Sequence, residues 1–261
     1  MGIQRIASKW EKTKVLLMKD DLQPYIPETQ LFGLEHLQPM LDTYGLIYLK
    51  PDCGTYGQGV MNLERVPSEQ DPNITVLTLR SGIQSDSFAT LEEVFPVLQE
   101  RIGQRPYIMQ KGIRLLTYNE RCFDLRVLVQ KNYRNMWETT GYIGRVAALQ
   151  KIVTNHHNGG SSFPVNELLK GYMDVHRMAQ FITELRGLGQ RVGQQLSRKY
   201  PKLKEIGLDI AVDAEFKLWI LEVNTKPALF PFKWLKDKTI YKRIRRYAVR
   251  YGRLRAKRRA Y

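Results

Sequence analysis

The chain has 261 residues, of which 43% are apolar and 26% are charged, and these are ordinary values for a globular protein. Two cysteines and four histidines are too few for a disulfide framework or a structural zinc site. No apolar run approaches the ~20 residues that span a bilayer, and the first ten residues lack the apolar segment of a signal peptide. We therefore expect a cytoplasmic protein.

The formal net charge of +15 is concentrated at one end of the chain. Residues 233–261 hold 13 Lys and Arg against one Asp, whereas residues 1–232 hold 28 basic against 25 acidic side chains. The basic segment also carries tyrosines between its arginines. Such a segment can bind nucleic acid, an anionic membrane surface or an acidic protein, or it can be a solvated helix. The charge therefore leaves the function of the body open.

Apolar residues at helical spacing predict three helices in the first half of the chain, over residues 9–22, 30–43 and 90–102. Thr29 can cap the second helix, and Thr90 with Glu93 forms a capping box for the third. Further on, strands are predicted over residues 106–113, 123–130, 136–149, 206–212 and 217–223, with the longest helix at 174–199. The alternation in 123–130 places Asp124 and Arg126 on one face, where they can pair with each other or serve a site.

A glycine-rich loop follows an apolar run that ends in Lys50, in the stretch LIYLKPDCGTYGQGV at 46–60. Glycines let backbone amides approach an anion closely, and Lys50 adds a positive charge. A Walker A loop and a Rossmann loop are excluded, because GK[ST] and a following helix are missing and residues 60–66 read as a strand. The loop is either a nucleotide-binding hairpin or a surface turn with a solvated lysine.

Two acids and an amide are expected to meet on the second hairpin. Glu222 and Asn224 are two residues apart on a strand, so their side chains leave the same face, and Asp209 on the neighbouring strand can join them. Such oxygen ligands suit Mg²⁺, which binds through a few carboxylates and substrate phosphates. The apolar neighbours favour a part-buried ligand over a solvated edge. A cationic glycine loop and an acidic strand pair are together what a nucleotide-phosphate site requires.

At this point the residues match a known family. The chain resembles the ATP-grasp superfamily, most closely the YheC/YheD group of endospore coat-associated proteins, and it is similar to RimK-type glutamate ligases. The motifs that carry the resemblance are SKW at 8–10, YIPET at 25–29, YLKPDCGTYGQGV at 48–60, YIMQKGI at 107–113, FDLRVLVQK at 123–131, GRVA at 144–147, TNHHNGG at 154–160, GLDIAVD at 207–213 and LEVNTKP at 221–227.

The resemblance implies an α+β ATP-grasp fold, with a nucleotide-lid lobe over about 46–110, a metal and substrate lobe over 111–232 and a basic helical tail over 233–261. It assigns ATP contacts to Lys9, Lys50, Gly54, Tyr56, Gly57, Gln58, Gly59, Gln110, Lys111, Ile113 and Asn155. Of these, Gln110, Lys111 and Ile113 match the adenine-binding hinge, where backbone groups meet the base. It assigns the metal to Asp209, Glu222 and Asn224. It places Asp124, Arg126 and Arg145 beside the transferred phosphate and the acceptor carboxylate.

The activity implied is ATP-dependent amide formation between a carboxylate and an amine through an acylphosphate, with two Mg²⁺ ions for which Mn²⁺ can substitute. The expected substrates are glutamate and a peptide or spore-coat protein. If the basic tail binds this peptide or protein, we expect it to be acidic. The alternatives are an ATP-binding structural coat protein without turnover and, less favoured, nucleic-acid binding through the tail. Association with the spore coat and homo- or hetero-oligomers are compatible with each of these.

The sequence departs from the family pattern in two places. Few residues precede the first motif, so we expect most of the usual N-terminal domain to be missing, and the carboxylate pocket to be either incomplete or supplied by another chain. Ala228 stands where a glycine often follows the proline. This affects the substrate contacts expected of that loop and not the metal site.

Overall fold

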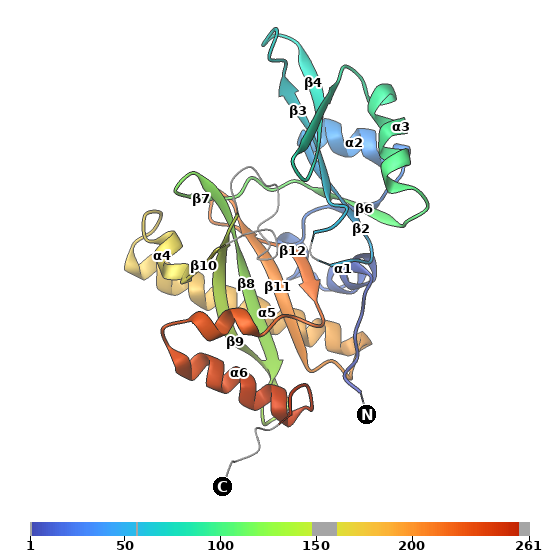
Figure 1. The fold of residues 1–261 in the computed structure, drawn as a ribbon. Helices are drawn as coiled ribbons and strands as arrows, with labels where there is room; N and C mark the ends of the chain where they lie inside the picture. The colour runs from blue at the N-terminus through green and yellow to red at the C-terminus, as the bar shows by residue number, and fades with distance from the viewer. Residues whose placement is uncertain (1, 56, 148–160, 256–261) are drawn as a thin grey trace.

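Two antiparallel sheets, each with its own helices and hydrophobic core, make up the molecule (Figure 1). The computed structural model describes residues 2–55, 57–147 and 161–255. Both described ends of the chain lie beside the second sheet, which is the lower one in Figure 1. Within the described part, no helix is both long and apolar enough to cross a membrane.

The first sheet has the strand order β1-β6-β2-β3-β4-β5. Its strands are β1 (Thr29–Leu31), β2 (Leu46–Pro51), β3 (Met61–Pro67), β4 (Thr75–Ser81), β5 (Gln84–Phe88) and β6 (Tyr107–Lys111). Two helices, α2 (Leu34–Tyr44) and α3 (Leu91–Ile102), bury their apolar sides against it. The hairpin expected around the glycine loop is confirmed, because β2 and β3 pair antiparallel on either side of it.

The N-cap predicted at Thr90 of α3 is confirmed, but the return bond of the capping box goes to the amide before Thr90. The Thr90 hydroxyl accepts a hydrogen bond from the Glu93 amide at 3.4 Å, and the Glu93 carboxylate accepts one from the Ala89 amide at 2.9 Å. The cap predicted at Thr29 is wrong. Thr29 lies in β1 opposite Gln110 of β6, so strand pairing replaces the expected first helical turn and α2 begins only at Leu34.

The second sheet has the strand order β10-β9-β8-β11-β12, and β7 pairs with β8 outside this path. Its strands are β7 (Thr117–Tyr118), β8 (Arg121–Lys131), β9 (Trp137–Val146), β10 (Ser161–Phe163), β11 (Glu205–Val212) and β12 (Leu218–Asn224). One face is covered by α1 (Lys9–Leu17), the short α4 (Val165–Leu169) and the long α5 (Val175–Lys199). A short 3₁₀ turn, η1 (Gln23–Tyr25), follows α1.

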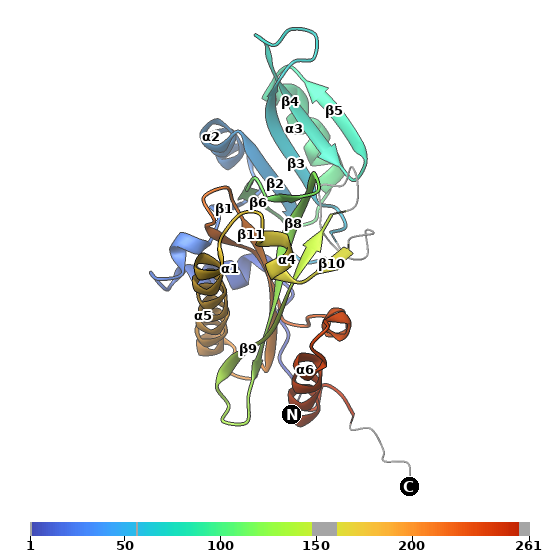
Figure 2. The same cartoon turned by 90° about the vertical axis from the view of Figure 1, so that its left-hand side faces the viewer.

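The basic C-terminal segment packs on the other face of the second sheet. It forms η3 (Phe230–Trp234) and α6 (Lys238–Arg250), and Figure 2 shows α5 and α6 on opposite sides of the strands. Ile244 of α6 and Phe232 of η3 are fully buried against Leu128 of β8. Gly141 of β9 makes room for this packing, since a Cβ there would lie 2.8 Å from the Phe232 ring.

On the face of β8 that points away from the main core, the two ends of the strand have different surroundings. Phe123, Leu125 and Val127 point into the main core, as their alternation predicts. On the opposite face, Leu128 lies under α6, whereas Asp124 and Arg126 line a cavity. The C-terminal segment therefore covers one end of the sheet and leaves the polar end of β8 open to a site.

We expect Phe232→Ala to lower the free energy of unfolding by about 3–5 kcal/mol, because it empties a fully buried position between α6 and the sheet. Trp234, 68% exposed in the same turn, is the matched control, and Trp234→Ala should change it by less than about 0.5 kcal/mol. Urea unfolding followed by circular dichroism measures both. Equal, small effects would show that α6 is not part of the folded core.

Candidate functional site

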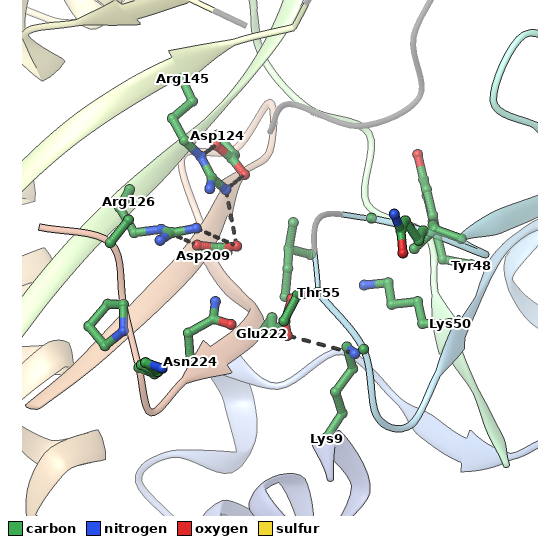
Figure 3. Close-up of a pocket in the computed structure, with 18 of the residues that line it drawn as sticks. Lys9, Tyr48, Lys50, Thr55, Asp124, Arg126, Arg145, Asp209, Glu222 and Asn224 are labelled. Carbon is green, nitrogen blue, oxygen red and sulfur yellow. Dashed lines mark hydrogen bonds and ion pairs between the residues drawn. The ribbon is translucent and has the colours of Figure 1, made fainter. Parts of the chain in front are cut away.

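A cavity of about 620 Å³ opens between the two sheets (Figure 3). The first sheet contributes Tyr48, Lys50 and Gln110 to its lining, and the second sheet contributes the opposite wall. Tyr56 and Asn155 lie outside the described residues, and Gly59 is in the loop but not in the lining. All the other predicted site residues line this one cavity: Lys9, Lys50, Gly54, Gly57, Gln58, Gln110, Lys111, Ile113, Asp124, Arg126, Arg145, Asp209, Glu222 and Asn224.

Lys50 reaches into the cavity from the end of β2 (Figure 3). Its ammonium donates a hydrogen bond to the side-chain oxygen of Gln110 at 2.6 Å, and the Gln110 amide donates in turn to the Thr29 hydroxyl at 3.2 Å. Burial disfavours the charged form and lowers the pKa of Lys50 from 10.5 to about 8. A bound anion would favour the charged form of Lys50, which burial disfavours.

Lys9 is held at the same cavity by the docking of α1 onto the end of β2. The Ser8 hydroxyl caps α1 and donates to the Asp52 carboxylate at 3.0 Å, and the Lys9 amide donates to the Asp52 carbonyl at 2.9 Å. The Lys9 ammonium donates to the Pro51 carbonyl at 2.9 Å and lies 3.7 Å from the Glu222 carboxylate. Lys9 thus joins the two walls of the cavity.

The glycine loop needs glycine at two positions for geometric reasons. Gly57 and Gly59 both have φ of 72°, a left-handed conformation that side chains rarely adopt. At Gly59 an added Cβ would also stand 2.6 Å from the Tyr107 hydroxyl, which donates to the Gly59 carbonyl at 2.9 Å. The loop is therefore hydrogen-bonded to β6 outside the cavity, while Thr55 and Gln58 line the cavity.

The predicted adenine hinge lies where β6 leaves the first sheet. The backbone amides of Lys111 and Gly112 donate to the carbonyls of Glu28 and Leu46, each at 2.8 Å, so these two amides already have partners. Among the described residues, the Ile113 amide donates no backbone hydrogen bond, and its side chain lines the cavity. A base bound at this hinge would meet the Ile113 amide rather than those of the two residues before it.

Asp209, Glu222 and Asn224 come together on the second wall, as the sequence predicts. Asp209 of β11 stands directly opposite Glu222 of β12, next to an irregularity in the register, and Asn224 follows two residues on. Two carboxylates and an amide are the oxygen donors that Mg²⁺ takes. Within the described ranges no three His, Cys, Asp or Glu side chains cluster as metal ligands. The donor set fits a Mg²⁺ ion that completes its shell with nucleotide oxygens.

Two arginines neutralise the aspartates beside this donor set (Figure 3). Arg126 donates to both oxygens of Asp209, at 2.5 and 3.2 Å, and Arg145 lies 3.1 Å from the same carboxylate. Arg145 also forms a two-pronged pair with Asp124, at 2.7 Å for its Nε atom. The sequence-level alternative, a pair between Asp124 and Arg126, is therefore wrong, because each of them pairs with a residue of a neighbouring strand.

The charges of this cluster shift the pKa values of Asp209 and Arg145. Burial alone would raise the pKa of Asp209, but Arg126 and Arg145 outweigh burial and hold that pKa below its ordinary value. Burial alone would lower the pKa of Arg145, but Asp124 and Asp209 outweigh it and raise that pKa. Asp209 and Arg145 therefore stay ionised at neutral pH, and Arg126 and Arg145 both line the cavity.

Sequence reasoning missed a second buried carboxylate, Glu205 at the start of β11. Its side chain is fully buried and accepts hydrogen bonds from Arg5, at 2.9 Å, and from Arg253. The same two arginines donate to the carbonyls of Thr225 and Pro227, in the loop that follows Asn224. Glu205 thereby fixes the loop behind the metal-ligand set. Its place at the start of a strand gave no signal, since its partners Arg253 and Arg5 lie 48 and 200 positions away in the sequence.

Residues that follow β12 also form one end of the cavity. Sequence reasoning placed Ala228 near the substrate, and the structure adds residues from η3 and from beyond α6. The residues of this end are Lys226, Pro227, Ala228, Phe230, Pro231 and Arg253.

Two sheets that enclose a cavity, with lysines and a glycine loop on one wall and carboxylates on the other, define a protein of the ATP-grasp class. The chain belongs to the YheC/D-like ATP-grasp family, whose model matches residues 3–254. ATP-grasp proteins are in general carboxylate–amine ligases that bind ATP and Mg²⁺.

Two curated proteins of Bacillus subtilis (strain 168) are similar to this chain. The endospore coat-associated protein YheC is 25% identical over 226 residues, which cover 85% of this chain and 60% of YheC. The endospore coat-associated protein YheD is 25% identical over 228 residues, which cover 84% of this chain and 48% of YheD. The chain thus spans about half to three fifths of the length of these relatives.

We expect the affinity for Mg-ATP to fall as the pH rises through about 8, approaching ~10-fold per pH unit, because only the protonated Lys50 attracts phosphate. Lys50→Arg keeps its charge throughout this range and should remove the pH dependence. Calorimetric titration at pH 7, 8 and 9 measures both proteins. A pH profile shared by wild type and Lys50→Arg would assign the titration to another group.

We expect Asp209→Asn and Glu222→Gln to weaken Mg-dependent nucleotide binding alike and to differ in stability. Asp209→Asn leaves two buried arginines short of a counter-charge and should lower the unfolding free energy by about 3–5 kcal/mol. The Glu222 side chain is 25% exposed, and Glu222→Gln should cost about 1 kcal/mol or less. Urea unfolding and nucleotide titration with and without Mg²⁺ separate the two effects. Equal destabilisation would contradict the distinct environments of the two acids.

Proposed function

We propose that the protein is an ATP- and Mg²⁺-dependent ligase that joins a carboxylate to an amine through an acylphosphate, with a peptide or spore-coat protein as acceptor and glutamate as the amino acid. The observation that carries the proposal is the single cavity in which Lys50 faces Asp209, Glu222 and Asn224, with Lys9 between the two walls. The family supports the general class of reaction.

The proposed reaction has two balanced steps. A carboxylate oxygen attacks the γ-phosphorus of ATP, the bond from that phosphorus to the β-γ bridging oxygen breaks, and ADP leaves. The amine nitrogen then attacks the acyl carbon, loses a proton, and displaces phosphate, which carries away one oxygen of the original carboxylate. No side chain has to act as a nucleophile, so the protein's work is positioning and charge compensation.

The residues of the cavity divide this work. Lys50 on the first wall and Lys9 between the two walls would neutralise the polyphosphate, and the glycine loop would exclude water from the acylphosphate. Arg126 and Arg145, held by Asp209 and Asp124, would stabilise the negative charge of the transferring group and of the tetrahedral oxyanion. Mg²⁺, held by Asp209, Glu222 and Asn224, would add charge compensation on the phosphates.

A structural role without turnover is the second candidate. Both curated relatives are named only as endospore coat-associated proteins. The engagement of both Asp209 oxygens by Arg126 also leaves this carboxylate fewer free lone pairs for a metal. In this alternative the protein would act at the spore coat and bind ATP without consuming it, whereas the ligase would act in the cytoplasm or at the coat.

The proposal predicts ADP release that depends on both a carboxylate and an amine. With Mg-ATP, glutamate and glutamate-containing peptides, turnover should fall at least ~100-fold in Glu222→Gln, which loses a metal ligand. When the carboxylate that attacks ATP is labelled with ¹⁸O, mass spectrometry should find one ¹⁸O atom in the released phosphate.

The controls separate the ligase from the structural candidate. Lys170→Gln, an exposed change outside the cavity, should leave turnover unaltered. Nucleotide binding without ADP release across a broad pool of amino acids and peptides would favour the structural role. ADP release without transfer of ¹⁸O would contradict the acylphosphate.

A further inference from the structure

Helix α6 carries a continuous row of positive charge on its outer side. Its inner side packs on the sheet through Ile244, Tyr247 and Ala248. On the outer side, exposed basic residues recur at every fourth position, so they follow one another along one face of the helix. We call them the α6 stripe: Lys238, Lys242, Arg246 and Arg250.

The charge of the α6 stripe is not compensated by the protein. Across residues 2–55, 57–147 and 161–255, no carboxylate lies within 4.0 Å of a side-chain nitrogen of the stripe. Lys238 donates to a carbonyl at 3.1 Å, and Arg250 lies 4.6 Å from the Tyr133 ring, so these contacts bring no negative charge. Like charges four residues apart destabilise a helix. A stripe of this kind is suited to an external anion.

The stripe is connected to the candidate active site by the chain itself. Lys226 and Phe230 are exposed and line the cavity, and the exposed Lys233 and Trp234 follow in η3 before α6 begins. Residues 226–250 contain nine basic side chains and one acidic side chain. A polymer that enters the cavity at this end therefore meets positive charge on the surface outside.

We propose that the α6 stripe docks an acidic polypeptide acceptor while its reacting group occupies the cavity, an inference that rests on the proposed ligase function. Successive stripe residues are about 6 Å apart along the helix axis. Side chains on one face of an extended peptide are about 6.6–6.8 Å apart, so alternate glutamates can meet successive cations. Nucleic acid offers negative charges too, but not the carboxylate that the proposed chemistry consumes.

The test compares two charge-reversed variants of the full chain. Lys242→Glu with Arg246→Glu reverses the centre of the stripe. Arg177→Glu with Arg186→Glu makes the same change in net charge at exposed positions of α5, on the opposite side of the sheet. Fluorescence anisotropy with a labelled ten-residue oligoglutamate measures affinity over a range of salt concentrations, and single-stranded DNA of equal charge is the comparison.

We expect the stripe variant to bind oligoglutamate at least ~10-fold more weakly than wild type, and the α5 variant to stay within about twofold. Equal binding by both variants, or tighter binding of the DNA than of the peptide, would overturn the proposal. In turnover assays the stripe variant should raise KM for oligoglutamate and leave that for a single amino acid unchanged. Stripe-dependent binding without any ADP release would reject the ligase function and still support the docking surface.

Discussion

The charged cluster of Asp124, Arg145, Asp209 and Arg126 is the interaction on which the rest of the site depends. Its members sit on three adjacent strands of the second sheet, and each aspartate faces an arginine across a strand pair. A buried ion of either sign is costly without its partner, so the cluster can form only in one register of β8, β9 and β11. The pairing of β11 with β12 in turn sets Asp209 opposite Glu222. Asp209 thus links the buried cluster to the carboxylate wall of the cavity.

The two ends of the chain then complete this wall from outside the sheet. The N-terminal segment brings Lys9 to the cavity and Arg5 to Glu205, and the C-terminal segment brings Arg253 to the same carboxylate. Residues more than 200 positions apart thus hold one loop in place. The family match covers both of these segments, since it extends from residue 3 to residue 254.

The sequence predicted most of the fold where the pattern of a segment determines its structure. The alternation in β8, the Thr90 cap of α3 and the strands around the glycine loop are local signals, and all three are confirmed. It failed where pairing with a distant strand overrides local preference, as at Thr29. The sequence also could not show that α6 packs on the second sheet, because this contact depends on Phe232 and on the gap left by Gly141.

The sequence predicted which residues line the candidate site, but not which side chains pair with one another there. Matching motifs placed fourteen described residues around a cavity that the structure contains, whereas the pairing of Arg126 with Asp209 needed the strand order. The burial of Glu205 could not be predicted, since a lone glutamate at the start of a strand is ordinarily solvated. The roles of these residues in binding and catalysis remain proposals.

The central claim is that one nucleotide lies between the two walls, with its phosphates at Lys50 and Lys9. The most direct measurement is affinity labelling with an acylphosphate derivative of ATP, which transfers its acyl group to lysines beside the phosphates, followed by peptide mass spectrometry. We expect labelling at Lys50 or Lys9, and excess Mg-ATP should suppress it. Labelling confined to the lysines of α6, or unaffected by Mg-ATP, would contradict it.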